Sequence, residues 1–140
     1  MCDGHGVNGH KVSADIKAEL PKLLEEKLKQ DADFLNNSQT KEFQDRLPKY
    51  FRDCFQTIHD GFNNKSYDCY LSGSTITSVL FDSKRIYCAN AGDSRAVLYT
   101  QSKKGGIKVT ALSDDHKPGL PKERARIEKM NGRVEPIIGP

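Results

Sequence analysis

The chain has 140 residues, of which 36% are hydrophobic and 29% are charged, and it carries a net charge of +3. These values are typical of one soluble globular domain, and no apolar stretch reaches the roughly 20 residues that a membrane-spanning helix needs. The charges of both signs are spread along the sequence, and basic residues are not interleaved with exposed aromatic residues. This pattern argues against a nucleic-acid-binding module and against a membrane protein.

The four cysteines, Cys2, Cys54, Cys69 and Cys88, show no Cys-x-x-Cys spacing. Isolated cysteines in apolar or β-rich segments are typical of reduced thiols in an intracellular protein. The first residues have neither the basic nor the apolar region of a secretory signal. We therefore expect a cytoplasmic or nuclear protein.

The first third of the chain has the periodicity of an amphipathic helix. Apolar residues recur every three or four positions from Val12 to Leu28, which is the stripe that such a helix buries. Proline lacks an amide donor and crowds the preceding turn, so Pro21 predicts a kink or a new helix near Leu20. Residues 31–39 are rich in Asn, Asp and Ser, and they predict a loop.

The strongest periodic signal lies between Phe43 and Phe62 and predicts a long buried helix. A last helix is expected to begin at Pro121, to turn Ile127 and Met130 inward, and to end at the Asn-Gly pair that follows.

Between these helices the pattern changes to short β-rich runs. The predicted strands are residues 75–81, 85–90, 95–99 and 107–112. The connections between them are so short that the strands must form antiparallel hairpins. Helices followed by strands predict an α+β fold in which a pair of long helices packs against an antiparallel sheet.

An Asp-Gly-His-Gly sequence at residues 3–6 is the first motif that can support chemistry. Asp3 supplies a carboxylate, the hard oxygen ligand that Mg²⁺ and Mn²⁺ prefer, and Gly4 lets a backbone carbonyl approach the same ion. His5 can carry a proton near neutral pH. A simple turn is the alternative interpretation, because Asp, Gly and His all fit tight loops.

Three further motifs follow: Ser-Gly-Ser-Thr at 72–75, Asn-Ala-Gly-Asp-Ser-Arg-Ala-Val-Leu at 90–98, and Leu-Ser-Asp-Asp-His-Lys-Pro at 112–118. In this order the four motifs resemble the PP2C (PPM) family of manganese- or magnesium-dependent protein serine/threonine phosphatases. The resemblance runs from Asp3 to about Glu135. It implies a partial α-β-β-α sandwich over residues 1–140, with both flanks of the full domain missing.

The resemblance also implies roles for individual residues. Asp3 would contact both ions of a binuclear centre, Gly4 would offer its carbonyl, and Asp93 would help to bind a third, weaker ion. A water that bridges the two metals would attack phosphorus directly, and His5 would protonate the leaving serine or threonine oxygen. The substrates would be phosphoserine and phosphothreonine proteins.

Several residues have a structural interpretation beside the functional one. Asp93 could simply stabilise a β-turn between two strands, Arg95 is expected to pair with an acid, and the 72–75 motif is best interpreted as a strand entry. A surface or helix-capping role is expected for His10, and a turn leading into the last helix for residues 114–117.

The family needs an arginine and further acidic ligands that cannot be placed in this sequence. We therefore expect the parent protein to be a phosphatase and this chain to be inactive or nearly so by itself, with a pseudophosphatase or a regulatory fragment as the alternative. Half of a sandwich exposes strand edges and an apolar sheet face. Self-association is thus a further expectation.

Overall fold

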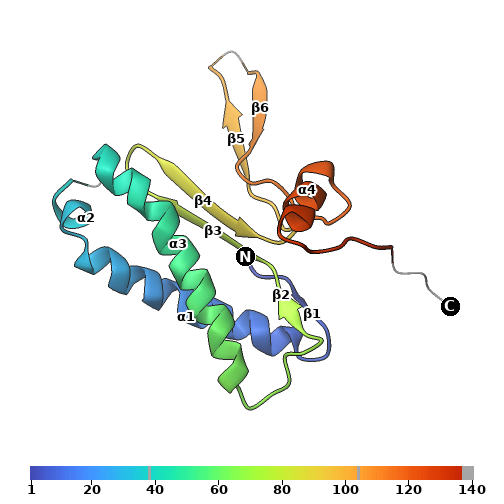
Figure 1. Cartoon of the computed structure of the whole chain (residues 1–140). Coiled ribbons are helices and arrows are strands. Elements are labelled where there is room, and N and C mark those ends of the chain that lie inside the picture. Colours follow the sequence, from blue (N-terminus) through green and yellow to red (C-terminus); the bar gives the residue numbers. More distant parts are fainter. Residues whose placement is uncertain (38, 104, 137–140) are drawn as a thin grey trace.

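The computed structural model describes residues 1–37, 39–103 and 105–136, and for residues 35–37 the backbone alone. The fold is α+β, as predicted, and the two long helices lie on one side of a β-hairpin (Figure 1). In chain order the elements are β1 (Gly4–His5), α1 (Gly9–Gln30), α2 (Ala32–Asn37), α3 (Lys41–Gly61), a 3-10 turn (Phe62–Asn64), β2 (Gly73–Ser74), β3 (Ile76–Phe81), β4 (Ile86–Ala91), β5 (Val97–Gln101), β6 (Ile107–Ala111) and α4 (Pro121–Lys129). Residues 38 and 104, which fall in predicted connections, lie outside the described residues.

Helix α1 runs unbroken through Pro21, so of the two outcomes predicted there, a kink or a new helix near Leu20, the new helix is wrong. A proline removes one backbone hydrogen bond, but most of the stability of a helix in a folded protein comes from packing of its apolar face. Leu20 and Leu24 are both buried against the core on either side of this position. Their burial outweighs the local cost of the proline.

The loop expected at residues 31–39 contains the short helix α2, so this prediction is wrong in part. The Asp31 carboxylate accepts hydrogen bonds from the amides of Asp33 at 2.9 Å and Phe34 at 3.3 Å. A carboxylate in this position satisfies amides that have no partner inside the helix. The polar composition that suggested a loop therefore provides the start of a helix.

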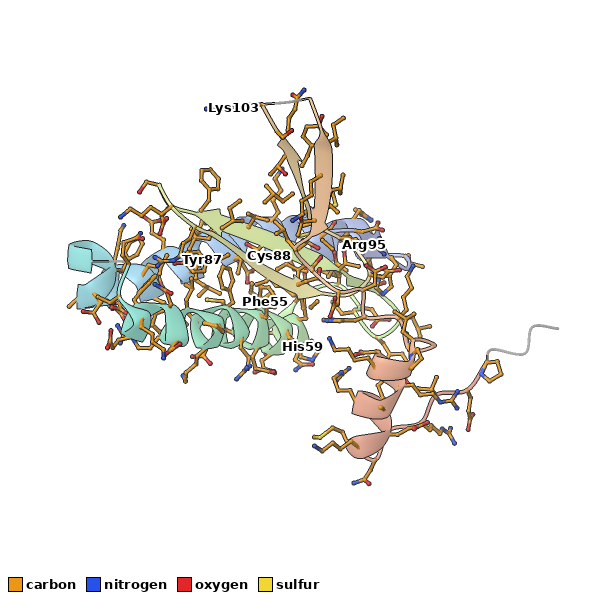
Figure 2. The ribbon with its side chains drawn as sticks, turned by 90° about the horizontal axis from the view of Figure 1, so that it is seen from above. Phe55, His59, Tyr87, Cys88, Arg95 and Lys103 are labelled. Atoms are coloured by element: carbon orange, nitrogen blue, oxygen red, sulfur yellow. The ribbon has the colours of Figure 1, made fainter. Side chains whose placement is uncertain are left out.

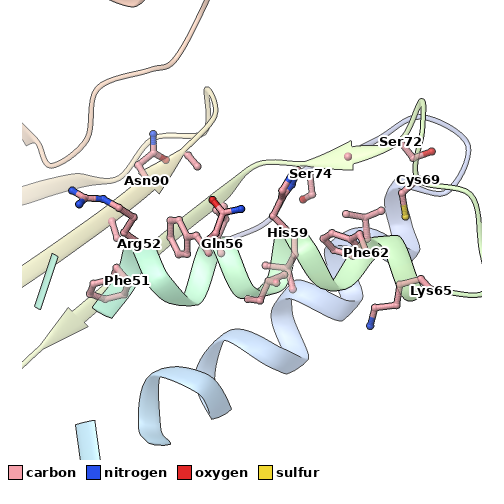
Figure 3. A pocket seen from close by; sticks show the side chains of 18 of the residues that line it. Phe51, Arg52, Gln56, His59, Phe62, Lys65, Cys69, Ser72, Ser74 and Asn90 are labelled. Carbon is pink, nitrogen blue, oxygen red and sulfur yellow. The ribbon is translucent and has the colours of Figure 1, made fainter. Parts of the chain in front are cut away.

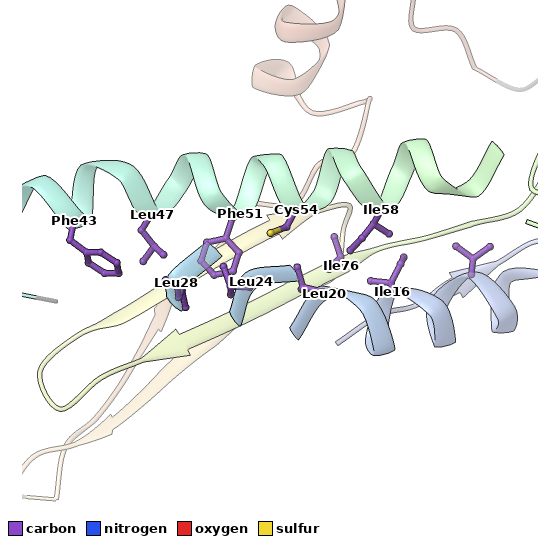
Figure 4. Close-up of a cluster of buried hydrophobic side chains, with 11 residues drawn as sticks. Ile16, Leu20, Leu24, Leu28, Phe43, Leu47, Phe51, Cys54, Ile58 and Ile76 are labelled. Atoms are coloured by element: carbon purple, nitrogen blue, oxygen red, sulfur yellow. The ribbon is translucent and has the colours of Figure 1, made fainter. Parts of the chain in front are cut away.

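The core lies between α1, α3 and the inner face of β3, where apolar side chains from the three elements meet (Figure 4). The long buried helix predicted from Phe43 onward is confirmed as α3, whose cap residue Thr40 accepts a hydrogen bond from the Phe43 amide at 3.3 Å. The buried hydrophobic residues are Val12, Ile16, Leu20, Leu24, Leu28, Phe43, Leu47, Phe51, Cys54, Ile58 and Ile76.

The described strands form three separate antiparallel pairs, β1–β2, β3–β4 and β5–β6. The four predicted strands correspond to β3, β4, β5 and β6, with ends that shift by one or two residues. Hairpin β3–β4 lies against the helices, whereas hairpin β5–β6 stands away from them in both views (Figures 1 and 2).

Helix α4 begins at Pro121 as predicted, and it ends where the Asn-Gly pair was expected to stop it. Asn131 has a positive φ of 61°, and the Gly132 amide donates to the Ile127 carbonyl at 2.9 Å. The inward orientation predicted for Met130 is wrong, because its side chain is exposed. Within the described residues, no helix is both long and apolar enough to cross a membrane.

Candidate functional site

The Asp-Gly-His-Gly motif forms a short ladder with the Ser-Gly-Ser-Thr motif. In this ladder β1 pairs with β2, so that Gly4 lies opposite Ser74 and His5 lies opposite Gly73. The strand-entry interpretation of residues 72–75 is thus confirmed. Because β3 begins directly after β2, the ladder also places Asp3 beside the start of β3. The Asp3 carboxylate is exposed there.

Close packing against the start of α1 requires the first glycine of the motif. A Cβ atom on Gly4 would lie 2.2 Å from the carbonyl oxygen of Gly9, which is far inside van der Waals contact. Gly6 has a positive φ of 78°, a conformation that favours glycine. The two glycines therefore have a structural role that is independent of any metal.

The His5 side chain lies over Gly73, because a Cβ atom on Gly73 would come within 2.7 Å of the imidazole Nε2 atom. His5 also lines a cavity of about 1230 Å³ beside α3, β2 and β4. Figure 3 shows the wall that α3 contributes, with Gln56 and His59 facing the β2 side. His10 is exposed in the first turn of α1, so its predicted surface position is confirmed.

Thr75, the last residue of the Ser-Gly-Ser-Thr motif, connects the Asp-Gly-His-Gly motif to the motif that contains Asp93. Its Oγ1 atom accepts a hydrogen bond from the Asp3 amide at 3.0 Å and lies 2.6 Å from the Ser94 Oγ atom. A Cβ atom on Gly92 would meet the Thr75 Cγ2 atom at 2.7 Å, so the turn packs directly on this side chain. No motif or periodicity indicates this role of Thr75, because a threonine at a strand entry is common.

The turn after β4 is held from its other side by the fourth motif. The Gly92 amide donates to the His116 Nδ1 atom at 3.3 Å, and the His116 amide donates to the Gly92 carbonyl at 3.0 Å. Arg95 donates two hydrogen bonds of 2.8 Å to the Asp115 carboxylate. Both the acidic partner expected for Arg95 and the structural interpretation of residues 114–117 are confirmed.

The Asp115 side chain is nearly inaccessible, and hydrogen bonding to the Arg95 guanidinium lowers the pKa of its carboxyl group. Asp93 differs from Asp115 in its exposure to solvent. Its carboxylate is exposed in the turn, with an Oδ2 atom 3.8 Å from the Lys117 ammonium nitrogen. The predicted turn position of Asp93 is confirmed, and its carboxylate remains open to solvent.

The described residues offer few ligands for a metal ion. In residues 1–37, 39–103 and 105–136, no three His, Cys, Asp or Glu side chains gather in a group that could hold an ion. Asp3 and Asp93 supply two carboxylates, whereas Mg²⁺ and Mn²⁺ take about six oxygen ligands. The described residues alone do not complete a metal site.

Comparison with known proteins places these motifs in a family. The family model for protein phosphatase 2C matches residues 2–139. A probable protein phosphatase 2C 72 from Arabidopsis thaliana is 36% identical over 135 residues, covering 94% of this chain and 39% of that protein. A probable protein phosphatase 2C 64 from Oryza sativa subsp. japonica is 37% identical over 134 residues, covering 94% and 30%. The chain belongs to the protein phosphatase 2C family.

A solved structure has the same fold. The crystal structure of serine-threonine phosphatase 2C from Toxoplasma gondii matches with a TM-score of 0.56 and 19% identity, covering 91% of this chain and 42% of that one. The present chain therefore spans between 30% and 42% of the length of these relatives. The four motifs, which lie between Asp3 and Pro118, fall within the residues that the family model matches.

Proposed function

We propose that this chain carries part of the active site of a metal-dependent protein serine/threonine phosphatase. The observation that supports the proposal is the junction at Thr75, which holds the strand of Asp3 and the turn of Asp93 together. Asp3 and the Gly4 carbonyl provide oxygen ligands suited to Mn²⁺ or Mg²⁺. The substrates of the complete enzyme would be phosphoserine and phosphothreonine proteins.

His5 is the candidate general acid of this proposal. It is exposed beside the Asp3 strand and lines the cavity, so a phosphorylated side chain can approach it. An imidazolium can donate a proton to a departing serine or threonine oxygen at neutral pH. Asp3 and His5, which only Gly4 separates in the sequence, would thus have different roles in one hydrolysis: Asp3 would bind the metal, and His5 would donate a proton to the leaving group.

The proposal includes low activity for these 140 residues by themselves. Two carboxylates leave most coordination positions to water, which predicts weak metal affinity. The same small ligand set supports a second candidate function, a binding or regulatory fragment of the phosphatase fold. Turnover and metal binding distinguish the two functions.

The test combines both measurements on the 140-residue chain. Mn²⁺ binding is followed by the loss of the free-ion electron paramagnetic resonance signal, and turnover by phosphate release from a phosphothreonine peptide. We expect weak binding that Asp3→Asn abolishes and that His5→Ala leaves in place. Any turnover should disappear in both variants. The matched control is His10→Ala, which changes an exposed histidine outside the motif.

Each outcome decides one part of the proposal. Mn²⁺ binding that is unchanged in Asp3→Asn would remove Asp3 from the metal site. Turnover that survives His5→Ala would remove the general acid. Rapid turnover by the unmodified chain would show that two described carboxylates suffice, and the expectation of low activity would be wrong. Binding without any turnover would favour the regulatory fragment.

A further inference from the structure

Residues 65–72 form a segment without helix or strand that leads from the 3-10 turn after α3 to β2 (Figure 1). It runs beside the first part of α1 and reaches the Asp-Gly-His-Gly motif. Most of its side chains are polar, and those of Ser66, Asp68 and Tyr70 are exposed. The segment therefore depends on individual contacts to α1, and not on a strand ladder, for its position. We call residues 65–72 the strap.

The first end of the strap is held by a cluster of polar contacts on α1. The Lys65 ammonium nitrogen lies 2.6 Å from a Glu19 carboxylate oxygen and 3.0 Å from the Asp15 Oδ2 atom. The Tyr67 hydroxyl donates to the same Asp15 oxygen at 2.7 Å. The Lys11 ammonium nitrogen lies 5.4 Å from the centre of the Tyr67 ring. We call Asp15, Glu19, Lys65 and Tyr67 the clasp.

The groups of the clasp have the protonation states at neutral pH that these contacts need. Burial, and after it the hydrogen bond to Asp15, raises the pKa of Tyr67 to about 12. The hydrogen bond from Tyr67, and after it the one from Lys65, lowers the pKa of Asp15. The phenol is therefore a donor and the carboxylate an acceptor. The side chains of Lys65 and Asp15 are 25% and 33% exposed, so water screens their attraction only in part.

The second end of the strap contacts the motif through Asn8, the residue before α1. The Asn8 side-chain amide donates to the Asp68 carbonyl at 2.9 Å, and its backbone amide donates to the Ser72 Oγ atom at 3.0 Å. A Cβ atom on Gly6 would clash with the Leu71 carbonyl oxygen, so the strap and the motif are in direct contact. The strap thus ends against the residues that follow the histidine of the motif.

The strap leads directly into the strand on which His5 rests. It ends at Ser72, and the next residue, Gly73, lies opposite His5 in the β1–β2 ladder and beneath its imidazole. The Tyr70 amide donates to the Asp68 carboxylate at 2.8 Å and stiffens the strap between its two ends. A displacement of the strap would therefore displace the surface on which the imidazole rests.

We propose that the strap positions the His5 imidazole and that Tyr67 is the positioning residue through which α1 holds the strap. The inference rests on the proposed function, in which His5 donates a proton to the leaving oxygen. A general acid must lie within hydrogen-bond reach of that oxygen, so its orientation contributes to the rate. Tyr67 acts through the strap, which contacts Asn8 and leads into Gly73.

Tyr67→Phe tests the inference in the 140-residue chain, because it removes the hydroxyl and keeps the ring and the net charge. The hydrogen bond to Asp15 is lost, so the strap should separate from α1 more often. Hydrogen exchange of the Asn8 amide should accelerate by roughly threefold to tenfold, which corresponds to one hydrogen bond. The nuclear magnetic resonance signal of the His5 Cε1–H group should shift.

Tyr50→Phe is the matched control. The Tyr50 hydroxyl donates to the Asp31 carboxylate at 2.6 Å, so the same group is removed from the same kind of contact at the other end of α1. Both variants should lower the free energy of unfolding. Only Tyr67→Phe should change the exchange of the Asn8 amide and the His5 signal, because a purely structural role would give both variants the same effect.

Lys65 provides a second test of the clasp. Lys65→Met removes the ammonium group that contacts Asp15 and Glu19, and it should accelerate exchange of the Asn8 amide as Tyr67→Phe does. Lys65→Arg keeps the positive charge, and it should stay within about twofold of the unmodified chain. Circular dichroism checks that each variant keeps the fold.

Two results would overturn the inference. The first is an unchanged His5 signal and unchanged Asn8 exchange in Tyr67→Phe. The second is an equal change of both readouts in the Tyr50→Phe control. These measurements need no turnover, so they are separate from the test of the proposed function: turnover that survives His5→Ala would contradict the general acid, whereas an unchanged His5 signal in Tyr67→Phe would contradict the strap.

Discussion

Asp3 and Thr75 hold each other through two hydrogen bonds. The Asp3 amide donates to the Thr75 Oγ1 atom at 3.0 Å, and the Thr75 amide donates to the Asp3 carbonyl at 3.0 Å. Thr75 is only 8% exposed, so solvent cannot replace its hydroxyl contacts. Because the same hydroxyl lies beside Ser94, one threonine fixes the position of the Asp3 strand and of the Asp93 turn.

Thr75→Val should lower the free energy of unfolding by about 1–3 kcal/mol, because it leaves the Asp3 amide and the Ser94 hydroxyl without a partner. Urea unfolding measures this loss, and hydrogen exchange of the Asp3 amide locates it. The control Thr75→Ser keeps the hydroxyl and should protect the Asp3 amide as the unmodified chain does. Equal exchange rates in the two variants would mean that the hydroxyl does not hold Asp3.

Gly4→Ala should destabilise the chain strongly, because the added Cβ atom would lie 2.2 Å from the backbone oxygen of Gly9. A backbone atom cannot move aside as a flexible side chain can, so β1 must separate from the start of α1. We expect a loss of about 1–3 kcal/mol or more, as for overpacking in a core. Urea unfolding of the variant measures the loss.

Gly61→Ala is the matched control for this experiment. A Cβ atom on Gly61 would meet nothing within 4 Å, and the residue ends α3 with a helical φ of −62°. Alanine restricts the unfolded chain more than glycine does, so this variant should gain about 0.4–1 kcal/mol. A gain at both positions would show that the contact between Gly4 and Gly9 is not tight.

The parts of the fold that the sequence predicted are those with a strong period. The period of three or four residues in α3 and the alternation of apolar residues in β3–β4 both follow from burial of one face, and the structure confirms this burial. The absence of a helix start at Pro21 and the exposure of Met130 have the opposite cause. Each depends on whether another element packs there, and a local pattern does not contain that information.

The connections within the candidate site could not be predicted from the sequence. The motifs, through the family that they resemble, point to Asp3, His5 and Asp93 as candidate site residues, and Arg95 was predicted to pair with an acid. The link through Thr75 joins positions 72 residues apart, and neither periodicity nor composition indicates a hydrogen bond over such a separation. The brace between Gly92 and His116 was missed for the same reason.

Asp31 joins the end of α1 to α3 through a buried carboxylate. Its two oxygens accept hydrogen bonds from Arg46, each of 3.0 Å, and one also accepts the Tyr50 hydroxyl at 2.6 Å. The hydrogen bonds from Arg46, and after them the one from Tyr50, lower the pKa of Asp31 far below its usual range. The folded state thus favours the ionised carboxylate.

This pKa shift predicts a particular pH dependence. The pKa of an aspartate in an unfolded chain is about 3.9, and that of Asp31 is lower in the folded state. The stabilisation is therefore complete above about pH 4 and is lost as the pH falls through the folded pKa. Asp31→Asn should lower the free energy of unfolding by about 1–3 kcal/mol at pH 7. It should also flatten the loss of stability below pH 4, as measured by urea unfolding at several pH values.

Asp45→Asn is the control, because Asp45 is an exposed carboxylate on the same helix as Arg46. This variant should follow the unmodified chain at every pH. Stability curves of Asp31→Asn and the unmodified chain that stay parallel from pH 7 to acid would show that Asp31 does not carry the acid sensitivity.

Gly73→Ala should displace the His5 imidazole, because the added Cβ atom would lie 2.7 Å from its Nε2 atom. The imidazole is the free end of a side chain, so it can swing away, and the free energy of unfolding should change little. Nuclear magnetic resonance of the histidine Cε1–H groups should therefore show a shifted His5 signal in a folded protein. His10 is the internal reference, since it lies exposed on α1 and its signal should stay in place. An unchanged His5 signal would mean that the imidazole does not rest on Gly73 in solution, and its position beside the Asp3 strand would then not be fixed by that contact.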